Sequence, residues 1–239
     1  MNKALTHLVF DLDGTLVQMD ERKVEWGYMR KAIPRFARLI SPFRFRKAFW
    51  KSADAMLRND SSKTNFEAYV DALAAHSPFA REKVERTARL SIEEDFASLG
   101  AFIEPVPGAR ETLALAVRLG YRLVVATNPV FPLSAVLTRM KHGGVSSFGF
   151  DYITHAEVMT RCKPRVEFYR ELLEKLDVKG AQCLMIGNDP RKDLTAKEVG
   201  MRTFLLNRDV GNENLDDDRV DELGDYHDLQ QLLETERFR

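Results

Sequence analysis

The sequence predicts an α/β protein with a Rossmann-like parallel sheet, helices on both faces of that sheet, and an inserted all-helical unit. Three observations support this prediction. A short apolar strand lies near the N-terminus, a long stretch with helical spacing follows it, and helices and strands then alternate to the end of the chain. Alternation at this spacing is typical of βα units, whose strands lie parallel.

The first strand is predicted at residues 8–10, which are apolar and β-prone, and two aspartates follow directly. Residues 17–104 have helical spacing and almost no glycine, so they predict a separate unit of three or four helices. Local signals mark the helix boundaries: N-cap and first-turn pairs at Ser41-Pro42 and Ser77-Pro78, a capping box at Thr64-x-x-Glu67, and a bend or end at Pro34.

After residue 106 the alternation begins. Helices are expected at 111–119, 133–142, 165–176, 191–199 and 226–234, and strands at 121–127, 150–154, 183–188 and 202–206. We therefore divide the chain into an α/β core formed by residues 1–16 and 107–239 and a helical cap formed by residues 17–106. The cap enters just after the first strand, where it is expected to cover the carboxyl edge of the sheet.

The composition is that of an ordinary globular protein, with 239 residues of which 44% are hydrophobic. Because 36 basic residues balance 36 acidic ones, the net charge gives no sign of a nucleic-acid or membrane partner. Without a signal segment or a membrane-spanning apolar stretch, the expected location is the cytoplasm. Cys162 and Cys183 agree with a reducing compartment and are expected to be buried, inert thiols.

The charges are unevenly distributed along the chain. Residues 22–58 hold eleven Lys and Arg against two acids, and residues 207–239 hold eleven acids against four Arg. Solvated helix faces and an acidic tail are one explanation. The alternative is that the basic stretch faces the mouth of the active site and attracts anionic substrates.

Polar residues follow four of the predicted strands. Asp11 and Asp13 follow the first, Thr127-Asn128 the second, Lys163-Pro164 opens the helix after the third, and the sequence GNDPRKD (187–193) follows the fourth. Open α/β sheets bind ligands at the carboxyl ends of their strands, so these segments are expected to meet in one site.

In these segments the sequence resembles the haloacid dehalogenase superfamily, in particular its phosphatase-like branch with a helical cap after the first strand. The matching stretches are FDLDGTLV, ATN, CKPRVEFY and IGNDPRKDLTAKEVGM, in the order of the family. The resemblance implies a Mg²⁺-dependent hydrolase that cleaves phosphate monoesters of small metabolites through an aspartyl-phosphate intermediate.

The chemistry of a phosphate monoester agrees with these residues. The reaction needs cations around the phosphoryl group, an oxygen nucleophile in line, and a proton donor for the leaving alcohol. Asp11 is the expected nucleophile and Asp13 the general acid and base. Lys163 is expected to pair with Asp11 and the phosphoryl oxygens, and Thr127 and Asn128 to bind the phosphate.

Gly14 permits the tight turn after the two acids, and Thr15 is expected to orient Asp13. By analogy with the family, Mg²⁺ is expected on the Asp11 carboxylate, the Asp13 backbone carbonyl and an acid of the segment 187–193. The chain departs from the family at Asn188, where many relatives have an acid. Asp189 is therefore favoured over Asn188 as the charged ligand. Asp193 is expected to support the site by pairing with Lys163.

Other functions remain possible on this evidence. A sugar phosphomutase of the same fold and a catalytically weak binding or regulatory protein share these motifs. Dehalogenase chemistry is disfavoured, since as a family those enzymes lack the second acid of the pair, which is Asp13 here. The expected partner is a small phosphorylated substrate, with neither nucleic acid nor membrane, and the protein is expected to be a monomer or a homodimer.

Overall fold

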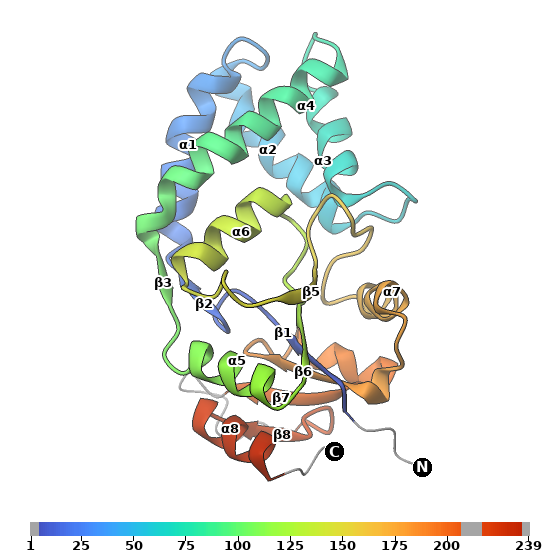
Figure 1. Ribbon diagram of the computed structural model, residues 1–239. Helices are drawn as coiled ribbons and strands as arrows, with labels where there is room; N and C mark the ends of the chain where they lie inside the picture. Colours follow the sequence, from blue (N-terminus) through green and yellow to red (C-terminus); the bar gives the residue numbers. More distant parts are fainter. Residues whose placement is uncertain (1–4, 207–216, 236–239) are drawn as a thin grey trace.

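The computed structural model describes residues 5–206 and 217–235 and has a helical layer above an α/β layer (Figure 1). The α/β layer is built on one six-stranded sheet in the order β5-β4-β1-β6-β7-β8, in which every neighbouring pair is parallel. The predicted fold class is therefore confirmed. The strands are β1 (His7–Phe10), β4 (Arg122–Val125), β5 (Phe150–Ile153), β6 (Cys183–Gly187), β7 (Arg202–Leu206) and β8 (Glu222–Gly224).

Side chains of the strands alternate between two helical layers, as the period of two in a strand requires. Leu8 and Phe10 of β1 belong to the hydrophobic cluster that includes α5 (Ala109–Arg118) and α8 (Tyr226–Glu234). Val9, between them, belongs to the opposite cluster, with α7 (Val166–Leu176) and the 3-10 helix η4 (Leu194–Val199). The central strand is thus buried on both faces, which explains its uniformly apolar sequence.

Between β1 and α5 the chain forms a helical insert, defined here as residues 21–102. It contains α1 (Glu21–Phe36), α2 (Pro42–Leu57), α3 (Asn65–Ala74), α4 (Arg81–Leu90), a π-helix η1 (Ser91–Phe96) and a 3-10 helix η2 (Ala97–Phe102). The insert has its own hydrophobic cluster, which also includes Ala135 of α6 (Leu133–His142). Through this contact the insert packs against the α/β layer.

Several helix signals act as expected. The capping box is formed, since Thr64 Oγ1 accepts from the Glu67 amide and Glu67 Oε2 accepts from the Thr64 amide at 2.8 Å. Pro34 lies two residues before the end of α1, and Ser41-Pro42 occupies the N-cap and first position of α2. The prediction at Ser77-Pro78 is wrong. The Ser77 hydroxyl accepts from the Phe79 amide in a local turn, and α4 begins only at Arg81.

The structure also corrects the ends of the predicted helical unit. Residues 17–19 and 103–105 are not helical but form the antiparallel strands β2 (Val17–Met19) and β3 (Ile103–Pro105). Val17 is fully buried in the cluster of the core. These strands are too short for a period of two to be visible in the sequence. Strand β8 was missed, and the helix expected at 191–199 is a 3-10 helix that begins at Leu194.

The division into a core of residues 1–16 and 107–239 and a cap of residues 17–106 stays a proposal. Its boundaries fall at the ends of the β2–β3 ribbon. Within residues 5–206 and 217–235, no helix is both long and apolar enough to cross a membrane. Part of the acidic stretch 207–239 lies outside the described residues. Cys162 and Cys183 are buried free thiols, and burial raises the pKa of each to about 12.

Candidate active site

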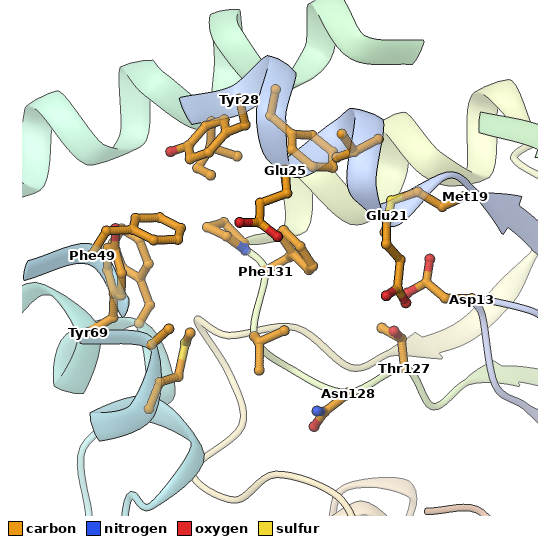
Figure 2. A pocket seen from close by; sticks show the side chains of 18 of the residues that line it. Asp13, Met19, Glu21, Glu25, Tyr28, Phe49, Tyr69, Thr127, Asn128 and Phe131 are labelled. Carbon is orange, nitrogen blue, oxygen red and sulfur yellow. The ribbon is translucent and has the colours of Figure 1, made fainter. Parts of the chain in front are cut away.

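The segments that follow β1, β4 and β6 meet at one cavity of about 500 Å³ between the sheet and the insert. Asp11 and Asp13 come from the first segment, Thr127 from the second and Asp189 from the third, and all of them line the cavity. Figure 2 shows Asp13, Thr127 and Asn128 on one side of it, with side chains of the insert opposite. The sequence-predicted residues are therefore gathered where parallel strands place a ligand site.

Lys163 is the buried cation of this site. Its Nζ lies 2.9 Å from Asp11 Oδ1 and 2.6 Å from Asp193 Oδ1, so it bridges the segments after β1 and β6. Burial alone would lower the pKa of Lys163, but the carboxylates of Asp11 and Asp193 outweigh it and hold the pKa well above its ordinary value. Lys163 therefore keeps its charge at the place where an anionic group would arrive. Its amide donates to Asn128 Oδ1 at 3.1 Å, which ties the β4 segment to the same centre.

The Asp11 carboxylate is largely buried at the cavity, since its side chain is 13% exposed. Burial raises the pKa of Asp11 to about 7, with Lys163 acting in the opposite direction. The lysine is therefore the interaction that favours the charged, nucleophilic form of this carboxylate.

Asp193 holds Lys163 in place, as the sequence predicted. Its Oδ1 pairs with the lysine and its Oδ2 accepts from the Asp189 amide at 3.0 Å. The glycine at 187 makes this approach possible, because a Cβ there would lie 2.7 Å from Asp193 Cβ. Behind the pair, buried Tyr169 donates from its hydroxyl to the Lys192 carbonyl at 2.9 Å and fixes the turn that carries Asp193.

Asp13 pairs with a residue that sequence reasoning missed. Arg139 of α6 is fully buried, and its Nη1 donates to Asp13 Oδ2. The other oxygen, Asp13 Oδ1, is buried and has no hydrogen-bond partner among the described residues. A signal for Arg139 was present, since helical spacing places it on the same buried face as Ala135 and Val136. A cation on an apolar face needs a buried acid as its partner.

Thr15, Gly14 and Asn188 form a second contact between the segments after β1 and β6. Thr15 Oγ1 donates to Asn188 Oδ1 at 3.1 Å, so Thr15 orients Asn188 rather than Asp13. Gly14 has a φ of +83°, a conformation that favours glycine, and a Cβ there would lie 2.9 Å from Asn188 Cγ. The amide of Asn188 thus packs directly against the loop that carries Asp11 and Asp13.

Asp189, which the sequence favoured as the charged metal ligand, has both oxygens engaged locally. Oδ1 accepts from the amides of Arg191 and Lys192, at 2.9 and 3.2 Å, and Oδ2 lies 2.8 Å from Lys192 Nζ. Burial acts to raise the pKa of Asp189, but the interactions with Lys192 and Arg191 hold it below its ordinary value. Asn188 carries fewer competing contacts and lies nearer to the first loop.

The donor set suits a hard cation such as Mg²⁺. Asp11 offers a carboxylate, Asp13 a backbone carbonyl and Asn188 or Asp189 a further oxygen. In the part of the chain that the structure describes, no three His, Cys, Asp or Glu residues are grouped closely enough to hold a metal by themselves. Mg²⁺ does not require such a group, because it is commonly held by one or two carboxylates, water and substrate phosphate oxygens.

Comparisons with known proteins identify a protein family and named relatives for this chain. A protein-family model described as haloacid dehalogenase-like hydrolase matches residues 5–200. The chain is 29% identical over 201 residues to a glyceraldehyde 3-phosphate phosphatase of Pyrococcus abyssi, covering 82% of this chain and 79% of that protein. It is 28% identical to the probable phosphatase IndB of Dickeya dadantii, covering 81% and 77%.

Solved structures match over nearly the whole chain. A HAD phosphatase from Thermococcus onnurineus aligns with a TM-score of 0.58 at 20% identity, covering 96% of this chain and 98% of that one. The L-2-haloacid dehalogenase RSc1362 aligns with a TM-score of 0.58 at 21% identity, covering 97% and 100%. At these identities the structures show the fold, and the family model shows the membership: the chain belongs to the haloacid dehalogenase-like hydrolases.

Proposed function

We propose that the protein is a Mg²⁺-dependent phosphatase that hydrolyses small phosphate monoesters through an aspartyl-phosphate on Asp11. The observation that carries this proposal is the bridge from Lys163 to Asp11 and Asp193 at the floor of the cavity. It places a fixed positive charge beside an oxygen nucleophile, which is the arrangement that phosphoryl transfer needs. The phosphatase names of two relatives support the same reaction class.

The first half of the reaction is a displacement at phosphorus. An Asp11 carboxylate oxygen forms a bond to phosphorus while the bond from phosphorus to the alcohol oxygen breaks. Asp13 gives its proton to the departing oxygen. Lys163 pairs with the phosphoryl oxygens, and the Thr127 hydroxyl donates to one of them.

The second half regenerates the carboxylate. Asp13, now ionised, takes a proton from a water molecule, whose oxygen attacks phosphorus and breaks the bond to Asp11. Inorganic phosphate and free Asp11 result. Asp11, the Asp13 carbonyl and Asn188 or Asp189 would hold Mg²⁺, which when bound would neutralise negative charge on the phosphoryl group. The geometry favours Asn188 for the third position, because the Asp189 oxygens already have partners.

The substitution Asp11→Asn tests this proposal, with p-nitrophenyl phosphate as substrate and release of inorganic phosphate as the readout in the presence of Mg²⁺. The loss of kcat is expected to reach several orders of magnitude, because the nucleophile and a metal ligand are removed together. Phosphate release also distinguishes hydrolysis from the return transfer of a phosphomutase.

Asp54→Asn is the matched control. Asp54 lies on the surface of α2, in an exposed pair with Arg58 at 2.8 Å, and is not one of the residues that line the cavity. This variant is expected to retain wild-type activity, since exposed pairs contribute little. A folded Asp11→Asn protein that keeps more than a tenth of the wild-type rate would contradict the assignment of the nucleophile.

A further inference from the structure

The insert, together with Phe131 of the segment after β4, gives the cavity a wall of aromatic rings. Six rings follow one another in contact, with centroids 5.3 to 6.4 Å apart: Phe131, Phe96, Tyr28, Phe49, Tyr69 and Phe66. Apart from Glu21 and Glu25, every side chain of the insert that lines the cavity is apolar or aromatic. Such a wall offers few hydrogen bonds to the hydroxyl groups of a sugar.

Two carboxylates interrupt this wall. Glu21 and Glu25 are one turn apart on α1, and both line the cavity. Figure 2 shows Glu25 extending into the cavity that Tyr28, Phe49 and Phe131 also line, and Glu21 extending toward Asp13. Within residues 5–206 and 217–235, neither has an ion pair or a side-chain hydrogen bond. Like charges at this spacing repel each other, and a bound cation would relieve that repulsion.

The basic residues of the insert do not neutralise these carboxylates. None of its Lys or Arg side chains lines the cavity, although residues 22–58 are rich in them. Protein cations lie over the two terminal rings only, Arg139 at 4.6 Å from the Phe131 centroid and Arg89 at 4.4 Å from that of Phe66. Phe96, Tyr28, Phe49 and Tyr69, the four rings between them, have no cation over them in the described chain.

We propose that Glu25 and the rings of Tyr28, Phe49 and Tyr69 bind an ammonium group of the substrate. The substrate is then a phosphate monoester whose alcohol part carries a positively charged nitrogen, and this assignment rests on the proposed phosphatase function. Aromatic faces attract ammonium groups, and a carboxylate beside them selects for positive charge. A carboxylate would instead repel a second phosphate or a carboxylate on the substrate. The cavity, at about 500 Å³, has the size of an ordinary small-molecule site.

Two substrates of equal shape provide the test: choline phosphate and 3,3-dimethylbutyl phosphate, in which carbon replaces the nitrogen. The ratio of their kcat/KM values is compared between wild type and Glu25→Gln, so that differences in leaving-group chemistry cancel. In wild type the charged ester is expected to be the better substrate, and in Glu25→Gln the ratio is expected to fall about tenfold. Phe49→Leu, which removes a ring, is expected to lower the ratio as well.

Glu82→Gln is the matched control, because Glu82 lies exposed on α4 outside the cavity lining. It is expected to leave the ratio unchanged. An equal ratio in wild type and Glu25→Gln overturns the proposal, as does faster turnover of the neutral ester or of glycerol phosphate by the wild-type protein.

Turnover of p-nitrophenyl phosphate, measured in parallel, separates this inference from the proposed function. If no ester is cleaved by the wild-type protein, the phosphatase assignment fails. The ammonium site is then examined by binding alone, with choline expected to raise the melting temperature of wild type more than that of Glu25→Gln. An equal shift in the two proteins, or none, counts against the site itself.

Discussion

Arg139 lies wholly inside the protein, although a guanidinium keeps its charge at any physiological pH. Its Nη1 donates to Asp13, and its guanidinium carbon lies 4.6 Å from the centroid of the Phe131 ring. The arginine therefore joins the proposed proton donor to the end of the aromatic wall. It acts through Asp13 and has no assigned contact with the substrate, so we regard it as a positioning residue.

Replacing Arg139 by Met is expected to lower the free energy of unfolding by about 2–4 kcal/mol, because it leaves a partly buried carboxylate without its counter-charge. Activity is expected to fall more for an alkyl phosphate than for p-nitrophenyl phosphate, whose leaving group needs no proton. Chemical denaturation and kcat for the two esters measure these effects.

Asp13→Asn and the double variant serve as controls for this prediction. If Arg139 acts through Asp13, adding Arg139→Met to Asp13→Asn costs less activity than adding it to wild type. Equal losses in the two backgrounds, or equal losses for the two esters, would show that Arg139 only fills space.

Among the secondary-structure elements, α3 begins at a capping box that can be read from the sequence. The capping box at Thr64 and Glu67 satisfies two amides at the helix N-terminus, and the next residue, Asn65, is fully buried. The Asn65 Nδ2 donates to the carbonyl of Pro129 at 3.2 Å, in the segment after β4. The start of α3 therefore fixes the insert against the floor of the cavity.

Thr64→Ala is expected to lower the free energy of unfolding by about 1 kcal/mol, because the Glu67 amide loses the Thr64 hydroxyl as its hydrogen-bond acceptor. Thr87→Ala is the matched control. Thr87 lies in the interior of α4, where its hydroxyl donates to the Lys83 carbonyl at 2.9 Å, and alanine favours such a position. Urea denaturation measures both changes, and an equal effect at the two sites would contradict the role of the box.

The sequence predicts regular elements better than irregular ones. The strand at 202–206 and the helix at 133–142 have the bounds expected from their apolar spacing. Strand β8 was missed because its three residues, Glu222–Gly224, include one apolar side chain and show no usable period. The helix start predicted at Ser77-Pro78 was wrong because a serine hydroxyl caps a turn as readily as a helix.

The floor of the site was predictable for a different reason. Asp11 directly follows β1, and Lys163 and Asp193 lie in the segments after β5 and β6, whose strands end at the same edge of the parallel sheet. Glu25 was not found because its importance depends on how α1 packs against the sheet, whereas for Arg139 the available signal, its helical spacing with Ala135 and Val136, was not used. No local pattern in α1 distinguishes a glutamate that faces a cavity from one that faces solvent.

At the scale of the whole molecule, the Lys and Arg side chains of the basic stretch 22–58 do not line the cavity. From this stretch the cavity is lined by apolar, aromatic and acidic side chains, while its cations lie on exposed helix faces or, as in Arg35, pair with Glu94 and Asp95 at 2.7 and 2.6 Å. The structure thus favours solvated helix faces over attraction of anions toward the site.

Raising the ionic strength from about 0.02 to about 0.5 M is therefore expected to leave kcat/KM for p-nitrophenyl phosphate without a marked decrease, at saturating Mg²⁺. A variant with Arg38, Arg44 and Arg46 changed to Gln is expected to show the same salt dependence. These three side chains are exposed and outside the cavity. A several-fold fall in kcat/KM in wild type that is absent in the variant would instead indicate that this stretch attracts anions.

The ribbon of β2 and β3 joins the helical insert to the α/β layer. Val17 pairs with Pro105 and Met19 with Ile103, so the polypeptide leaves the α/β layer and returns to it at neighbouring positions. The helical insert is therefore joined to the α/β layer through two adjacent strands, and we expect its removal or exchange to leave the register of the six-stranded sheet unchanged. Asp11 and Lys163 belong to the sheet layer, whereas Glu25 and most of the rings belong to the insert. On the functions proposed above, reaction chemistry and substrate choice belong to separate segments, and we expect a transplanted insert to change the substrate preference while the proposed nucleophile stays in place.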